Sequence, residues 1–176
     1  MSAAVCRSGA LITAVFADRM NIYARAVATA LADPDPWRGF TGYIHAVCAM
    51  QAAGRGFAEV LTMTFPAAKA LEARRTEAYH GFLELITRAK ASGHLREDFD
   101  DRDLPILLMA NAGVVAATQD AAPDTWRRLI DHMLRSFAAP TTDIPPLTPP
   151  PAAAALYRAM VHLGRPSTGQ RENPNT

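Results

Sequence analysis

The sequence has few cysteines, almost no net charge and no long apolar run. Its two cysteines are far apart and form no CxxC pair, which argues against structural zinc and favours a reducing compartment. The 18 basic and 17 acidic residues leave a net charge of +1, which argues against a chain that binds mainly phosphate backbones. No segment approaches the roughly 18 apolar residues of a membrane span, and the N-terminus lacks the layout of a signal peptide. We therefore expect a cytoplasmic protein that does not enter a membrane.

Sequence signatures of common catalytic sites are also missing. There is no GxSxG motif, no HExxH motif and no glycine-rich phosphate loop, and the serines fall at predicted ends and turns. The arginine pairs at 74–75 and 127–128 have no interleaved aromatic residues and fit solvated helix faces. We expect neither an enzymatic activity nor a cofactor.

Three local patterns contain metal-ligating residue types. Glu77 and His80 form an ExxH pair, but a di-metal bundle needs a second copy, which the chain lacks. His45 and Cys48 lie one helical turn apart without further ligands at a recognisable spacing. The acidic run 98–103 lacks the glycine and the distant glutamate of a calcium loop. Polar helix surface, a partly buried histidine and a helix start explain these patterns without a metal.

The abundant residue is alanine, and no alternation of β-branched residues accompanies it. Apolar residues instead recur every three or four positions, which predicts an all-α protein. We expect a helical bundle of six main helices followed by a proline-rich tail. The predicted helices are 10–32, 36–54, 56–63, 67–92, a fifth from about 100, and 123–138.

Helix boundaries have identifiable signals. Asp35 is a good N-cap, and Pro36 suits the first helical position, where no amide bond is lost. Gly93 suits the end of the fourth helix. Asp100, with Asp103 three residues later, favours the start of the fifth, where carboxylates complement the helix dipole.

Composition divides the chain into three parts. Eight of the 13 prolines follow residue 139, which predicts that the helical domain occupies 10–139. We expect 1–9 to be disordered or truncated. The remainder, 140–176, is predicted to be a proline-rich linker with one short helix at 152–163 and a disordered end.

The fifth helix is apolar on more than one side and therefore should have more than one packing partner. Asn111 interrupts it. An unpaired buried amide costs about 1–3 kcal/mol, so either a neighbouring backbone group binds Asn111 or the side chain lines a pocket or an interface.

Four segments together resemble the regulatory domain of TetR-family transcriptional regulators. LITAVFADRM (11–20) resembles the helix that follows the DNA-binding head, and DPDPWRGF (33–40) resembles the break after it. AGRGFAEVL (53–61) is similar to a short third helix, and AKASGHLRED (89–98) is similar to the turn before the penultimate helix. The resemblance covers about residues 10–139.

The resemblance implies a homodimer that binds a small, mostly apolar effector and thereby releases a repressor from operator DNA. The last two helices would pair across a two-fold axis. The implied effector pocket contains Phe16, Met20, His45, Cys48, Phe65, Tyr79, Phe82 and Asn111. The implied dimer seam contains Val114, Trp126, Leu129, Ile130, Met133 and Phe137.

The sequence departs from the family at its start. Nine residues precede the first predicted helix, too few for a three-helix head with a helix-turn-helix, so operator DNA would be bound only through a head outside this sequence. Three explanations remain open: a start codon placed too late, a fragment of a regulator, or a natural headless protein. A headless protein would sequester a ligand or form heterodimers. A helical-bundle metal enzyme is the third functional alternative.

Overall fold

The computed structural model describes residues 3–54, 69–140, 142–143, 145–146 and 148–163, with the backbone alone for 3–16, 71 and 161–163. In this part of the chain there is no β-strand, only an isolated bridge between Leu95 and Ala138. The prediction of an all-α fold is confirmed, whereas the predicted third helix at 56–63 lies outside the described residues. The described helices are α1 (Ala3–Ala32), α2 (Pro36–Ala53), α4 (Lys69–Ala91), α5 (Asp103–Thr118), α6 (Thr125–Phe137) and α7 (Ala153–Leu163).

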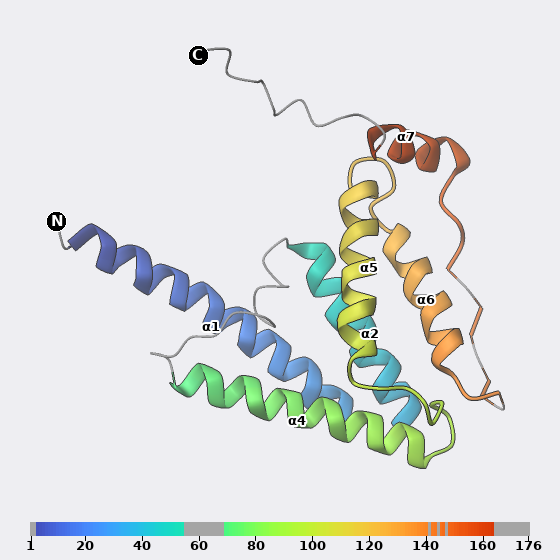
Figure 1. The fold of residues 1–176 in the computed structure, drawn as a ribbon, viewed down its shortest axis with the longest axis horizontal. Coiled ribbons are helices and arrows are strands. Elements are labelled where there is room, and N and C mark those ends of the chain that lie inside the picture. The colour runs from blue at the N-terminus through green and yellow to red at the C-terminus, as the bar shows by residue number, and fades with distance from the viewer. Residues whose placement is uncertain (1–2, 55–68, 141, 144, 147, 164–176) are drawn as a thin grey trace, which may run out of the picture.

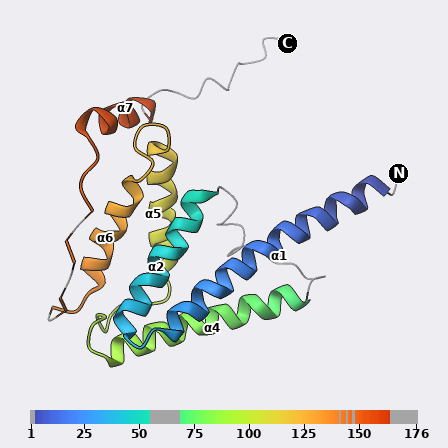
Figure 2. The same ribbon diagram turned by 180° about the vertical axis from the view of Figure 1, so that it is seen from behind.

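The helices form two groups that share α2 (Figure 1). α1 and α4 lie side by side, and the first turns of α1 extend away from the rest of the molecule. α5 and α6 pack against the other side of α2, as the view from behind also shows (Figure 2). α7 lies across one end of α5, and the segment before it runs along α6.

The predicted boundary signals act as expected at two helix ends. The Asp35 carboxylate accepts hydrogen bonds from the amides of Trp37 and Arg38 at 2.9 and 3.1 Å, so it caps α2 ahead of Pro36. Gly93 has a φ of 75°, and its amide donates to the Lys90 carbonyl at 2.8 Å. This left-handed conformation favours glycine and ends α4.

Two predicted starts differ from the structure. α1 begins at Ala3, so residues 3–9 are helical where disorder was expected. The alanines there favour a helix, and no proline stops it from extending toward the N-terminus. α5 begins at Asp103 instead of about 100. The Asp103 carboxylate accepts the Asp100 amide at 2.8 Å, which holds the preceding residues in turns.

Close backbone approach fixes α1 between α2 and α4. A Cβ added to Gly39 on α2 would lie 2.5 Å from the Ala30 carbonyl oxygen, and one added to Gly81 on α4 would lie 2.4 Å from Val27. Arg88 on α4 donates to two carbonyls at the end of α1, at 2.6 and 3.0 Å. Because these contacts leave no room for a methyl group, α1 is held tightly on both sides.

An aromatic cluster closes the core between the same three helices. The hydroxyls of Tyr23 on α1 and Tyr43 on α2 lie 2.8 Å apart. The Tyr43 ring stacks on Phe82 of α4, with centroids 5.1 Å apart. Burial raises the pKa of both tyrosines, so the pair is neutral and hydrogen-bonded.

The proline-rich tail packs on the helical domain, where the sequence suggested only a linker. Its Thr148 binds two α6 side chains, because Asp131 accepts from its amide at 2.7 Å and Arg128 donates to its carbonyl. The α7 helix agrees with the predicted 152–163 and buries Ala155 and Ala159. These contacts join residues far apart in sequence, which composition does not predict.

Candidate functional site

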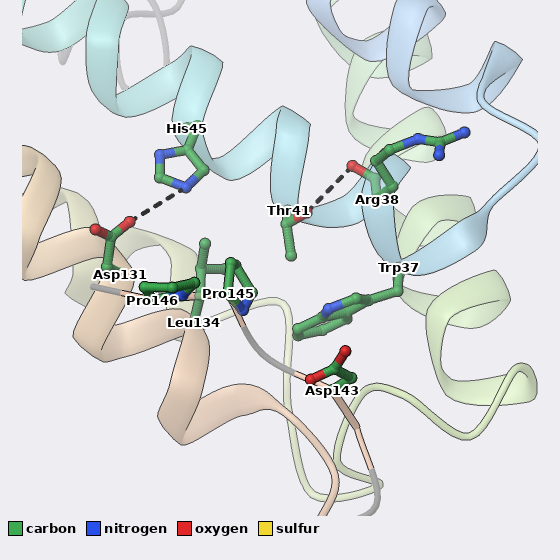
Figure 3. Close-up of a pocket in the computed structure, with 9 residues that line it drawn as sticks. All are labelled: Trp37, Arg38, Thr41, His45, Asp131, Leu134, Asp143, Pro145 and Pro146. Atoms are coloured by element: carbon green, nitrogen blue, oxygen red, sulfur yellow. Dashed lines mark hydrogen bonds and ion pairs between the residues drawn. The ribbon is translucent and has the colours of Figure 1, made fainter. Parts of the chain in front are cut away.

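A cavity lies between α2 and α6, next to the proline-rich tail (Figure 3). Its volume is about 240 Å³, whereas sites for drug-sized ligands typically measure roughly 300–1,000 Å³. Its wall is mainly apolar, so it suits a small molecule with an apolar body. The lining residues are Trp37, Arg38, Thr41, His45, Asp131, Leu134, Asp143, Pro145 and Pro146.

One face of α2 supplies the first wall of this α2–α6 cavity. Trp37, Thr41 and His45 are spaced by four residues and therefore lie along one side of the helix. The Asp35 cap fixes the backbone at Trp37. The Trp37 ring also stacks on Phe40, with centroids 5.8 Å apart and an angle of 20° between the rings.

α6 and the tail supply the opposite wall. Asp131 and Leu134 lie one turn apart on α6. The Asp131 carboxylate accepts from the Thr148 amide at 2.7 Å and also from the Thr148 hydroxyl. Arg135 donates to the Pro145 carbonyl at 2.8 Å. These bonds hold the tail against α6, and its prolines then line the cavity.

His45 presents an uncharged ring to the cavity. Burial lowers its pKa more than the neighbouring Asp131 raises it, and Arg127 lowers the pKa further. The His45 Nε2 atom lies 3.6 Å from Asp131 Oδ1, too far for a hydrogen bond. At neutral pH the imidazole therefore contributes an aromatic surface and no positive charge.

The charged groups around the cavity are mostly carboxylates. Asp131 and Asp143 both line it, and Figure 3 shows Asp143 beside the Trp37 indole. The Arg38 guanidinium instead forms two hydrogen bonds with Asp33, at 2.8 and 2.7 Å, and points away from the cavity (Figure 3). Its charge is therefore balanced elsewhere.

Two further cavities lie near α1. One of about 210 Å³ is lined by Tyr23, Arg75, Thr76 and Tyr79. The other, of about 330 Å³, is lined by Arg19, Ile22, Met50, Ala53 and Gly54. Both are more open to solvent than the α2–α6 cavity.

The outer face of α5 is apolar and exposed. Ile106 is 57% exposed and Met109 is 67% exposed. Gly113 and Ala116 continue the same stripe at a spacing of three to four residues, and a Cβ added to Gly113 would meet nothing within 4 Å. The opposite face of α5 is buried, so this helix has apolar surface for an additional partner.

Comparison with known families accounts for this helical arrangement. The sequence profile of SbtR-like transcriptional regulator C-terminal domains matches residues 35–136, more than half of the chain. The chain belongs to this family. Its members are non-enzymatic C-terminal domains of TetR-family regulators, which typically dimerise and bind effectors. No curated protein sequence matches the chain.

The SbtR-like match includes the α2 and α6 residues that line the α2–α6 cavity but not the tail residues that line it. Trp37 through Leu134 fall within the matched residues, whereas Asp143, Pro145 and Pro146 follow them. The tail thus adds one carboxylate and two prolines to the lining of a cavity whose helices belong to the family domain. Within the described ranges, no helix is long and apolar enough to cross a membrane.

The structure distributes the predicted pocket residues of this SbtR-like domain over several environments. His45 lines the α2–α6 cavity, and Tyr79 lines a different one, where it is 45% exposed and donates to Asp101 at 2.8 Å. The side chain of Phe16 and the whole of Phe65 lie outside the described residues. The remaining four are buried in the core: Met20, Cys48, Phe82 and Asn111. Their role in effector binding stays a prediction.

Asn111 is bound by its neighbours on α2. Its Nδ2 donates to Gln51 Oε1 at 2.7 Å and to the Cys48 carbonyl at 3.3 Å. Among the described residues its Oδ1 has no partner. The geometry favours the first alternative, in which Asn111 ties α5 to α2. Burial also raises the pKa of the Cys48 thiol to about 12, so this thiol is unreactive.

The predicted dimer seam is partly internal to the protomer. Trp126 and Ile130 are 4% and 0% exposed, and Met133 and Phe137 pack against the same core. Because Ile130 has no surface left for a partner, it supports the fold of the protomer. The half-buried Val114 and Leu129 complete the predicted set. The seam as a whole stays a prediction.

The candidate metal ligands lie in different environments. Glu77 and His80 are exposed on α4, and Cys48 is buried while His45 faces the cavity. In the part of the chain that the structure describes, no three histidine, cysteine, aspartate or glutamate side chains are placed to hold a metal ion.

Sequence reasoning missed most of the cavity wall. The spacing of four between Trp37, Thr41 and His45 was a usable signal for one face. By contrast, nothing local places Asp143 or Pro145 against α2, because the contact depends on how the tail returns along α6.

Proposed function

We propose that this SbtR-like domain is the effector-sensing and dimerisation domain of a TetR-family repressor. The observation that carries the proposal is the mainly apolar α2–α6 cavity. The α2 and α6 residues that line it lie within the residues that match the family, and α2 also packs closely against α1 at Gly39. A small, mostly apolar effector would fill this cavity and change the distance between α2 and α6.

The shared helix α2 would pass this change to α1. Gly39 of α2 lies against the backbone of Ala30, and Tyr43 of α2 is hydrogen-bonded to Tyr23. A displacement of α2 therefore moves α1 as well. Since α1 resembles the helix that joins a DNA-binding head, the effector would favour a dimer state with different α1 positions and would release the repressor from its operator.

A second copy of the chain would cover the exposed stripe of α5. Ile106 and Met109 provide its apolar surface. A C2 interface uses the same patch on both subunits, so one stripe pairs with itself. Burying it removes from water a surface that a monomer would leave exposed.

A matched pair of substitutions tests the dimer. Ile106→Asp places a charge in the stripe and should produce a folded monomer, whereas Ile22→Asp on α1 should leave the dimer intact. Sedimentation or light scattering measures the mass, and circular dichroism verifies that both variants are helical. A dimer that survives Ile106→Asp would contradict this interface.

Spin labels on α1 test whether a ligand in the α2–α6 cavity displaces α1. In a Cys6→Ser background, Asp18→Cys gives each protomer one exposed label on α1, because Cys48 is buried. Two aromatic probes, the neutral neopentylbenzene and the cationic benzyltrimethylammonium, are added in turn. We expect the label-to-label distance in the dimer to shift with whichever probe binds. Saturable binding with unchanged distances would contradict the release mechanism and favour a ligand-sequestering protein.

A further inference from the structure

We propose that the α2–α6 cavity selects a small organic cation, a molecule with an apolar or aromatic body and a positively charged amine. This inference rests on the proposed function, because it names the class of effector for the same cavity. It follows from the aromatic and acidic groups that converge there.

The body of such a ligand matches the apolar part of the wall. Trp37 presents its indole ring, while Leu134, Pro145 and Pro146 provide aliphatic surface around it. An indole face attracts a cation placed within about 6 Å of the ring, more strongly than other aromatic side chains do. The ring thus serves both the apolar body and the charge.

Two carboxylates in the wall favour a ligand with a positive charge. Asp143 lies beside Trp37, and Asp131 lies at the other side of the cavity near His45 (Figure 3). Arg38 also lines the cavity, but its guanidinium is paired with Asp33 and points away from the cavity, and the lowered pKa of His45 leaves its ring neutral. An anionic ligand would meet two carboxylates without an unpaired cation to balance its charge.

The arginines of α6 do not reverse this conclusion. Arg127 lies over the Trp126 ring at 4.5 Å and pairs with Asp124 at 3.2 Å. Arg128 and Arg135 donate to tail carbonyls. None of the three lines the cavity. Arg128 and Arg135 hold the tail in place, and the charge of Arg127 is balanced by Asp124.

The test compares three probes of similar size that carry a positive charge, no charge and a negative charge. Benzyltrimethylammonium is cationic, neopentylbenzene is its neutral carbon isostere, and 3-phenylpropionate is anionic. Trp126→Phe leaves Trp37 as the sole tryptophan, so quenching of its fluorescence reports binding in the cavity, and calorimetry on the unaltered protein gives a second readout. We expect saturable binding of the cation, about fivefold tighter than that of the isostere, and no binding of the anion.

Charge variants of Asp143 show whether the cavity prefers cations or binds any apolar ligand of this size. Asp143→Asn keeps the shape and should weaken the cation about threefold, as expected for an exposed charge. Asp143→Lys should abolish cation binding and create measurable affinity for 3-phenylpropionate, a gain that an unfolded variant cannot show. Asp120→Asn, an exposed aspartate outside the cavity wall, is the matched control and should change nothing.

The outcomes distinguish this inference from the proposed function. Equal affinity for the cation and its isostere, with no effect of the Asp143 variants, would overturn the cation class and leave the cavity as an effector site. If none of the probes quenches Trp37, the cavity itself is overturned as the effector site, while the Ile106→Asp test of the dimer stands independently.

Discussion

Over its first half, from Trp37 to His45, the two flanks of α2 differ in how completely they are packed. Toward α1 and α4, Gly39 allows direct backbone contact and Tyr43 stacks on Phe82. The cavity between α1 and α2 lies farther along α2, at Met50, Ala53 and Gly54. Toward α6, Trp37 and His45 border a cavity of about 240 Å³. A helix that is tightly packed on one side and loosely packed on the other can transmit a ligand-induced displacement, because the tight side moves with it.

Truncation of one aromatic residue on each flank gives the largest expected contrast. Phe82 is 2% exposed, so Phe82→Ala should lower the free energy of unfolding by about 3–5 kcal/mol through lost burial and a new void. Trp37→Ala borders an existing cavity and should cost much less. Urea unfolding at matched conditions measures both. Similar losses would show that the two flanks are equally packed.

Glycine substitutions on α2 test the close backbone approach. Gly39→Ala forces a Cβ against the Ala30 carbonyl and should cost about 1–3 kcal/mol of stability. Gly42→Ala has no atom within 4 Å and should instead stabilise the helix, by about 0.5–1 kcal/mol. Their midpoints of chemical unfolding provide the measurement. A neutral Gly39→Ala would refute the close contact.

The smallest expected effect is a pH dependence from the open flank. The folded-state pKa of His45 lies below its unfolded value, so the unfolded chain binds the proton more readily. The His45 contribution is complete above about pH 6.5 and is lost as the pH falls below it. We expect His45→Gln to reduce the acid-induced decline of the melting temperature, whereas His132→Gln, at an exposed position of α6, should leave it unchanged. Identical declines in both variants would exclude His45 as a contributor.

Local signals predicted the helices better than the contacts between them. Asp35, Pro36 and Gly93 set helix ends through hydrogen bonds and backbone angles that involve only nearby residues. The site was less predictable. Of the proposed pocket residues, His45 lies in the α2–α6 cavity, whereas Cys48, one turn later, is buried in the core. The helical rotation of about 100° per residue places Cys48 roughly 60° from His45 around α2, and tertiary packing decides which of the two directions faces the core.

The helices of the predicted dimer seam also show that a sequence pattern does not determine which residues contact each other. The apolar period of α6 correctly indicated a packed face, but Ile130 fills the core of its own protomer. Because α5 is apolar all round, its sequence could not show which side remains exposed; the exposed side contains Ile106 and Met109. Periodicity records that a face is apolar, and the arrangement of the neighbouring helices decides what covers it.

The sequence alone determined the helical class, the ends of α2 and α4, and the family of the domain, because alanine content, caps and short motifs act within a few residues. Tertiary structure decided that the proline-rich tail returns along α6, that Asp131 holds Thr148, and that Asp143 comes to lie beside Trp37. These contacts join segments far apart in the chain. Their positions depend on how helices pack in three dimensions, which no local pattern encodes.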